Sequence, residues 1–254
     1  MIMKCIAIIP ARYASTRFPG KPLAKIGEKT VIQRVYEQVN KEIAHVFVAT
    51  DDQRIMEHVE SWGGNAVMTS SEHQSGTDRI EEAMERIESE GGNFDVVVNV
   101  QGDEPFISPE QISSLCGCFA DEKTQIATLG IRFADDIAGI NSANSPKIVT
   151  DNDGFAMYFS RSVIPYCRGV EQDKLCDAFP YMKHIGMYAY RREVLRDITR
   201  LPQSALEIAE KLEQLRWLQN GYRIKVAETS IPTIGIDTPE DLEKAIRYAQ
   251  LNTL

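Results

Sequence analysis

Four short apolar runs in the first half of the chain, separated from one another by stretches with helical periodicity, place the strongest constraint on its fold. They cover residues 4–10, 45–50, 65–68 and 95–100, and each is nearly continuous in apolar or β-branched side chains. Strands that are apolar throughout, rather than alternately apolar and polar, are typical of a parallel sheet with helices on both faces. The pattern therefore predicts an α/β fold with a mostly parallel central sheet.

The second half of the chain predicts a change in the sheet. Two runs at residues 146–150 and 155–160 are joined by the turn at 151–154, which is typical of an antiparallel hairpin. The sheet is therefore expected to become mixed. The other expected elements are strands at 126–133, 183–190 and 222–228, a short segment at 233–236, a helix from Ser204 to a stop at Gly221, and a last helix that begins at Thr238.

The segment at residues 10–23 places three cations, Arg12, Arg17 and Lys21, directly after the first strand. The chain carries a formal net charge of −9, and yet no acidic residue occurs before Glu28. Small residues in this loop let the backbone approach a ligand, while arginine and lysine bind phosphate oxygens. A solvated basic turn is the alternative, but it does not explain the three prolines that stiffen the segment. The loop therefore predicts a site for the phosphates of a nucleoside triphosphate.

Polar side chains follow each of the four predicted parallel strands, where ligands of open α/β sheets bind. Asp103 follows the fourth strand, and Asp237 precedes the last helix on a short turn. Because Mg²⁺ prefers one or two carboxylates together with phosphate oxygens and water, these aspartates predict a magnesium site beside the triphosphate. The alternatives are that Asp103 caps a turn and that Asp237 favours the positive end of the following helix. Ser75 and Gly76 indicate a helix start that a base or a phosphate can approach.

Composition excludes several classes of protein. Hydrophobic residues make up 43% of the chain and charged residues 26%, and no apolar run reaches the roughly eighteen residues of a membrane span. An acidic chain is also a poor candidate for binding nucleic acid. The N-terminal segment lacks the pattern of a signal peptide, which predicts a cytoplasmic protein.

The cysteines form no pair at metal-binding spacing and are expected to be reduced and mostly buried: Cys5, Cys116, Cys118, Cys167 and Cys176.

Several motifs, in order along the chain, resemble the CMP-Kdo synthetase family, the cytidylyltransferases that activate 3-deoxy-D-manno-octulosonate (Kdo). The motifs lie at residues 10–23, 48–52, 73–79, 98–105, 158–161, 183–188, 212–216 and 235–241. The first motif suits many sugar nucleotidyltransferases, whereas its combination with those at 73–79 and 183–188 is similar to the Kdo branch. The segment at 144–148 departs from the family pattern, which leaves the role of its lysine open.

The resemblance implies a three-layer Rossmann-like nucleotide-diphospho-sugar transferase fold with a mixed, mostly parallel central sheet and a smaller inserted lobe. With the length of 254 residues, this implies a single domain. Its parts are a nucleotide-binding half at 1–125, a sugar-binding and dimerisation part at 126–230, and a return strand with a C-terminal helix at 231–254. The implied reaction converts CTP and Kdo into CMP-Kdo and pyrophosphate with Mg²⁺, supplies lipopolysaccharide biosynthesis, and takes place in a homodimer.

The resemblance also implies roles for individual residues. The expected catalytic residues are Arg12, Lys21, Asp103 and Asp237, of which the two aspartates are the expected metal ligands. The expected nucleotide contacts are Ala11, Arg12, Ser15, Lys21, Ser75, Gly76 and Gln101. The expected sugar-acid contacts are Arg79, His184, Tyr188, Glu213 and Gln214. Without the resemblance, a half-buried structural histidine is the commoner outcome for His184.

Two alternatives to this function remain open. One is the same chemistry on another sugar acid, such as sialic acid or an 8-amino analogue of Kdo. The other is a non-catalytic nucleotide sensor on the same fold. A Rossmann dehydrogenase is disfavoured because no Gly-x-Gly-x-x-Gly motif follows the first strand.

Overall fold

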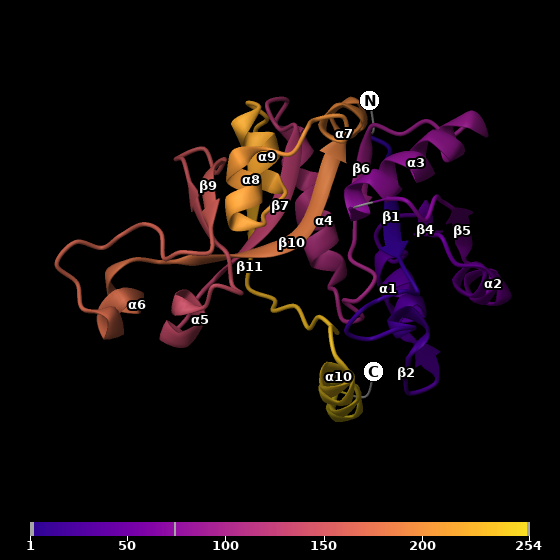
Figure 1. Cartoon of the computed structure of the whole chain (residues 1–254), viewed down its shortest axis with the longest axis horizontal. Coiled ribbons are helices and arrows are strands. Elements are labelled where there is room, and N and C mark those ends of the chain that lie inside the picture. Colours follow the sequence, from indigo (N-terminus) through magenta and orange to yellow (C-terminus); the bar gives the residue numbers. More distant parts are fainter. Residues whose placement is uncertain (1–2, 74, 253–254) are drawn as a thin grey trace. The chain divides into compact units, whose positions relative to one another are not determined.

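The four apolar runs of the first half form four parallel strands in the computed structural model, which describes residues 3–73 and 75–252. They are β1 (Cys5–Ala11), β4 (Val46–Thr50), β5 (Asn65–Met68) and β6 (Val96–Asn99), adjacent in the order β6, β1, β4, β5 (Figure 1). The predicted parallel arrangement is confirmed, and each strand begins and ends close to its predicted limits.

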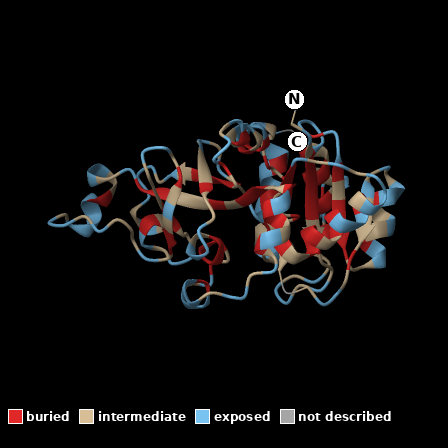
Figure 2. Ribbon diagram, turned by 90° about the horizontal axis from the view of Figure 1, so that it is seen from above, coloured by how far each residue is buried: buried red, intermediate tan, exposed pale blue. Residues whose placement is uncertain are grey.

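Both faces of this sheet are covered, as the continuous apolar runs predicted. Ile8 and Ile9 of β1 have no exposed surface, and neither do Val97 and Val98 of β6. Because neighbouring residues of a strand point to opposite faces, burial of both members of each pair requires packing on both sides. Figure 2 shows the buried residues gathered on the strands and on one side of the helices.

The chain divides into two compact units. The first combines Met1–Ser113 with Thr233–Leu254, and the second comprises Ser114–Pro232. The single domain expected from the sequence, with its parts divided at residues 125 and 230, stays a prediction.

Side-chain caps set the starts of the helices in the first unit. Ser75 and Thr238 each form a capping box, and Thr30 and Asp52 accept hydrogen bonds from backbone N–H groups of the first helical turn. A cap of this kind stabilises a helix by about 1 kcal/mol because it pairs an N–H group that the helix leaves free. The helices are α1 (Val31–Val39), α2 (Gln53–Ser61), α3 (Gly76–Ser89) and α10 (Pro239–Leu251).

The segment that returns to the first unit carries no strand, so the predicted return strand at 233–236 is wrong. It is held instead by one backbone hydrogen bond, from the Ile236 N–H to the Asp103 carbonyl at 2.9 Å, and by the buried Ile236 side chain. Ile236 packs with Ala245 of α10 and with Ile26 of a short hairpin, β2 (Lys25–Ile26) and β3 (Lys29–Thr30). This apolar cluster positions the next residue, Asp237.

The second unit contains the mixed part of the sheet. Its strands are β7 (Ile126–Arg132), β8 (Lys147–Thr150), β9 (Ala156–Ser160), β10 (Met182–Arg191) and β11 (Ile224–Thr229). β11 is parallel to β7, whereas β10 is antiparallel to β7 and β8, and β8 is antiparallel to β9. The predicted hairpin at 146–160 and the predicted mixed sheet are both confirmed.

The helix expected from Ser204 to Gly221 is two helices. α8 (Ala205–Glu210) begins with the predicted capping box at Ser204, but Lys211 adopts a left-handed backbone with φ of 54° and ends it. Arg161 stabilises this break, because its guanidinium donates to the carbonyls of Glu210 and Lys211. The buried Leu212 follows, and the next helix is α9 (Gln214–Gln219).

The remaining elements complete the fold. They are α4 (Pro109–Gly117), α5 (Ile137–Asn141), α6 (Leu175–Ala178), α7 (Arg192–Ile198) and three short 3₁₀ helices at Lys21–Leu23, Cys118–Ala120 and Gln172–Lys174. All five cysteines lie within the described ranges and none forms a disulfide there, as expected, but each is partly exposed, so the expectation that most are buried is wrong. No described helix has the length and hydropathy needed to span a membrane.

Candidate active site

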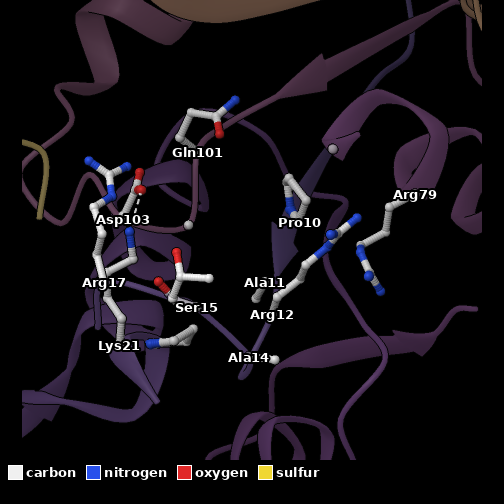
Figure 3. A pocket seen from close by; sticks show the side chains of 14 residues that line it. Pro10, Ala11, Arg12, Ala14, Ser15, Arg17, Lys21, Arg79, Gln101 and Asp103 are labelled. Atoms are coloured by element: carbon white, nitrogen blue, oxygen red, sulfur yellow. Dashed lines mark hydrogen bonds and ion pairs between the residues drawn. The ribbon is translucent and has the colours of Figure 1, made fainter. Parts of the chain in front are cut away.

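A pocket of about 390 Å³ lies in the first unit, where β1 and β6 end and α3 begins. It contains seven of the residues assigned to catalysis or nucleotide binding from the sequence, and Arg79. Its lining residues are Pro10, Ala11, Arg12, Ala14, Ser15, Thr16, Arg17, Lys21, Pro22, Gly76, Arg79, Gln101, Gly102 and Asp103. Figure 3 shows Arg17, Lys21 and Asp103 on one side of this pocket and Arg12 and Arg79 on the other. The three cations of the loop therefore surround one cavity.

The loop after β1 is shaped around Tyr13. The Tyr13 carbonyl accepts hydrogen bonds from the N–H groups of Ser15 at 3.0 Å and Gly20 at 2.9 Å. Gly20 has a φ of 73°, and a Cβ atom there would lie 3.1 Å from the tyrosine ring. Arg54 of α2 stacks on the ring at 3.3 Å from its centroid, and Asp52 holds that guanidinium with two hydrogen bonds. These contacts fix a turn that brings Arg12 and Lys21 to the same pocket.

Gly102 permits the close approach of the β6 end to β1. A Cβ atom at this position would lie 2.8 Å from the Pro10 carbonyl oxygen, closer than real Cβ contacts occur. Only glycine therefore fits between Gln101 and Asp103, which both line the pocket. The turn carries Asp103 towards the loop that holds Lys21.

Lys21 joins the two aspartates assigned to the metal. Its Nζ lies 2.7 Å from Asp103 Oδ2 and 3.5 Å from Asp237 Oδ1, and its side chain is only 13% exposed. Arg17 adds a second contact to Asp237, with Nη2 at 3.1 Å from Oδ1. Residues from the β1 loop, the β6 end and the start of α10 thus meet through charge, because α10 is anchored by the Ile236 cluster.

The donor set suits a hard divalent cation. The two carboxylates already face one positive charge, the Lys21 ammonium, and Mg²⁺ is usually bound by one or two carboxylates that leave positions for phosphate oxygens and water. Among the described residues there is no group of three or more histidine, cysteine, aspartate or glutamate side chains that could hold a metal ion. Asp103 and Asp237 therefore fit a metal that shares its coordination with a bound triphosphate, and not a closed protein cage.

Two of the assigned nucleotide contacts, Ser75 and Gly76, lie at the start of α3. Ser75 caps α3 and exchanges hydrogen bonds with Asp78, and it is not among the residues that line the pocket. Gly76 follows it and does line the pocket. A backbone N–H group at such a helix start is suited to binding an anion or a polar base edge.

Arg79 is assigned to the sugar acid, but its guanidinium is bound within the protein. Nη1 donates to Thr69 Oγ1 at 2.5 Å and Nη2 to Asp51 at 3.1 Å, and the side chain has no exposed surface. Burial lowers the pKa of this guanidinium, while the nearby charge of Asp51 acts in the opposite direction. Arg79 borders the pocket, and its role towards a sugar acid stays a prediction.

His184 and Tyr188 belong to the second unit and lie on the same face of β10. Their ring centroids are 5.4 Å apart, and the pairing of β10 with β7 shifts register between Ile185 and Tyr188. His184 Nε2 lies 3.1 Å from the Thr128 hydroxyl, which donates to the Met187 carbonyl at 2.8 Å. The Thr128 hydroxyl therefore lies between the His184 ring and the backbone of β10.

The other sugar-acid candidates of the second unit lie around α9. Glu213 binds Arg216 at 3.2 Å, and Gln214 is 4% exposed. The Gln214 Nε2 atom is buried and has no hydrogen-bond partner among the described residues. Tyr188 packs on Trp217 of α9 with centroids 5.1 Å apart, and burial raises its pKa. The structure therefore gathers His184, Tyr188 and the start of α9 in one aromatic region, whose role in sugar binding stays a prediction.

Burial of His184 predicts a pH dependence of stability. Burial lowers its pKa to about 3, from an ordinary value of 6.5. The unfolded chain binds a proton at this histidine below pH 6.5, whereas the folded chain does not until about pH 3. Protonation of His184 therefore has no effect on the free energy of unfolding above pH 6.5. Between pH 6.5 and 3 it lowers that free energy, by at most about 1.4 kcal/mol for each pH unit. Urea unfolding of the wild type and of His184→Phe from pH 8 to 4 measures this difference; parallel pH curves for the two proteins would contradict it.

Sequence reasoning did not assign three residues that shape the pocket. Arg17 is one of the three loop cations but received no role of its own, although its place between Arg12 and Lys21 could have indicated one. Gly102 could have been found from its place between two assigned residues. Arg54 could not, because nothing near it in the sequence indicates that it stacks on Tyr13.

The chain was compared with known proteins. The family model described as cytidylyltransferase matches residues 6–226. A 3-deoxy-manno-octulosonate cytidylyltransferase of Parabacteroides distasonis is 58% identical over 250 residues, which cover 97% of this chain and 98% of that protein. A protein with the same name from Bacteroides thetaiotaomicron is 58% identical over 248 residues, with the same shares of each chain.

Solved structures agree with these relatives. A CMP:2-keto-3-deoxy-manno-octonic acid synthetase complexed with CTP superposes with a TM-score of 0.89 at 41% identity, over 98% of this chain and 99% of that one. A 4-diphosphocytidyl-2C-methyl-D-erythritol synthase from Anaerococcus prevotii, at 16% identity, a TM-score of 0.59 and coverage of 98% and 99%, shows likeness of fold alone. The expected nucleotide-diphospho-sugar transferase-like fold is thereby confirmed. By sequence over nearly its whole length and by structure, the chain belongs to the 3-deoxy-manno-octulosonate cytidylyltransferase family.

Proposed function

We propose that this chain transfers CMP from CTP to Kdo, which gives CMP-Kdo and pyrophosphate for lipopolysaccharide biosynthesis. The observation that carries the proposal is the Lys21 ammonium held between Asp103 and Asp237 at a pocket lined by Arg12 and Arg17. This arrangement offers cations to a triphosphate and carboxylates to its metal. Relatives that match this chain over nearly their full length carry the name of this activity.

The reaction needs positioning and charge neutralisation more than a covalent intermediate. The anomeric 2-hydroxyl of the sugar acid attacks the α-phosphorus of CTP in line, its proton passes to water, and pyrophosphate leaves. Arg12 binds phosphate oxygens through its planar fork, and Lys21 adds a point charge beside the leaving group. When Mg²⁺ is bound at Asp103 and Asp237, it supplies further positive charge to the phosphates. The loop held by Tyr13 keeps these groups in place before CTP arrives, which limits the entropy lost in the reaction.

We assign base and ribose recognition to the small and neutral residues of the pocket. Ala11 and Gly76 allow close approach of the nucleotide, and Ser15 and Gln101 offer hydrogen bonds to it, as does Ser75, which precedes Gly76 and does not itself line the pocket. We assign recognition of the sugar acid to Arg79, His184, Tyr188, Glu213 and Gln214. The buried Gln214 Nε2 atom, which has no hydrogen-bond partner among the described residues, supports this assignment, because it can donate to a sugar hydroxyl.

A pyrophosphate-release assay with a panel of acceptors tests the proposed function. We expect release with CTP, Mg²⁺ and Kdo, and at least about tenfold slower release with sialic acid or with an 8-amino Kdo analogue, since an unmatched polar group in the site costs binding. Faster release with another sugar acid would assign the enzyme to that substrate. CTP binding without pyrophosphate release from any acid would identify a nucleotide sensor.

We further propose that the protein is a cytoplasmic homodimer, because CTP is available in the cytoplasm and the second unit exposes large apolar side chains. These are Met157 at 65%, Tyr166 at 86%, Leu206 at 36% and Ile208 at 51% exposure. If these residues form one contiguous patch, such a patch favours a protein interface. Sedimentation velocity should give twice the chain mass of 28.6 kDa, and Met157→Asp with Ile208→Asp should shift the protein towards the monomer. A wild-type monomer at micromolar concentration would contradict the proposal.

A further inference from the structure

We propose that Glu82 is a positioning residue for Arg12, and that it acts through His73. The inference rests on the proposed function, in which Arg12 binds the triphosphate of CTP. Glu82 lies on α3, outside the residues that line the pocket, and none of the roles assigned above includes it.

The Glu82 carboxylate holds the segment between β5 and α3 at two points. Its Oε2 atom accepts a hydrogen bond from the Ser70 backbone N–H at 2.8 Å and also contacts the His73 ring at Nε2. Its Oε1 atom accepts two hydrogen bonds from Arg86, at 3.0 and 2.6 Å. One oxygen therefore serves the loop, and the other serves the exposed surface of α3.

Glu82 stays ionised over the working range of the enzyme. Burial alone would raise its pKa, but the hydrogen bonds from Ser70, His73 and Arg86 outweigh burial and lower the pKa to about 2. The side chain is 20% exposed, so water reaches it only in part. A charged and partly buried acceptor of this kind makes strong hydrogen bonds, which restrain the His73 ring.

His73 connects this anchor to the pocket. Its ring is bound by Glu82, while its backbone carbonyl accepts a hydrogen bond from Arg12 Nη2. The two contacts come from opposite parts of the same residue, so fixing the ring also fixes the carbonyl. Arg12 is thereby held through Nη2, and the other N–H groups of its guanidinium can bind a phosphate.

Arg12 needs such a restraint for two reasons. Its long side chain has many rotamers, and ordering it only when CTP binds would cost affinity. The positive charge of Arg12 also contributes to lowering the pKa of Arg79, so these two guanidinium groups repel each other. The His73 carbonyl offsets this repulsion and keeps Arg12 at the pocket in the free enzyme.

Calorimetric binding of CTP, without Kdo, tests the inference. Glu82→Ala and His73→Ala should each weaken CTP binding about tenfold, the loss expected when one hydrogen bond to a charged group is no longer preorganised. The steady-state KM for CTP should rise by a similar factor, while kcat at saturating CTP changes far less. Glu85→Ala is the matched control, because Glu85 is an exposed carboxylate on the same helix, and it should leave both quantities unchanged.

A double-mutant cycle separates positioning from a general structural effect. In an Arg12→Ala background, Glu82→Ala and His73→Ala should cause almost no further loss of CTP binding, because the residue they position is absent. A full tenfold loss in that background, or no loss in the single variants, would overturn the inference. If Glu82→Ala fails to fold, His73→Ala carries the cycle alone. Absence of CTP binding or turnover by the wild type would instead contradict the proposed function.

Discussion

Asp103→Asn is expected to lower turnover by about 100- to 1000-fold while the fold remains intact. The amide keeps the shape of the carboxylate but loses its charge, and that charge pairs with Lys21 at 2.7 Å. Asp103 is also one of the two carboxylates that suit a divalent cation. Pyrophosphate release with CTP, Kdo and Mg²⁺ measures the loss, and circular dichroism and thermal unfolding report whether the fold is retained.

Two further variants make the Asp103 result specific. Asp237→Asn should have a smaller effect, because this carboxylate is 50% exposed and Asp103 is 31% exposed, so water replaces its interactions more readily. Asp153→Asn removes an equivalent charge from an exposed turn in the second unit and should leave turnover unchanged. Near wild-type formation of CMP-Kdo by Asp103→Asn would refute the role in metal binding.

Lys21→Met is expected to cause a loss of similar size, about 100- to 1000-fold in turnover. Methionine retains most of the side-chain volume but removes the Lys21 ammonium group, which contacts both Asp103 and Asp237. The phosphates then lose a nearby cation, and the two carboxylates are left close together, with Arg17 still in contact with Asp237. Single-turnover pyrophosphate release at saturating CTP isolates this effect from substrate binding.

Lys25→Met is the matched control for Lys21, because Lys25 is an exposed lysine four residues further along the chain. It should show wild-type turnover. If Lys21→Met changed KM for CTP but left kcat unaltered, Lys21 would contribute uniform binding of the nucleotide and not stabilisation of the transition state.

Local sequence was sufficient where the physical cause was itself local. The four apolar runs gave parallel strands, and the caps at Ser75, Ser204 and Thr238 begin the helices that they predicted. The prediction for residues 204–221 was wrong because the helix ends at Lys211, which has no glycine or proline to indicate the break. The carbonyls at that end are bound by Arg161, a residue remote in the sequence.

The sequence alone determined that the chain has a parallel α/β core, a cationic loop after the first strand and an aspartate at the end of β6. Runs of apolar residues, helix caps and clusters of charge involve only a few neighbouring residues, so these features can be predicted from the sequence. Only the tertiary structure decided that Lys21 meets Asp237 from 216 residues away, that Arg79 is bound by Asp51 and Thr69, and that His73 joins Glu82 to Arg12. These contacts depend on packing, such as that of Ile236 against α10, which brings remote charges within hydrogen-bond distance and which no local pattern encodes.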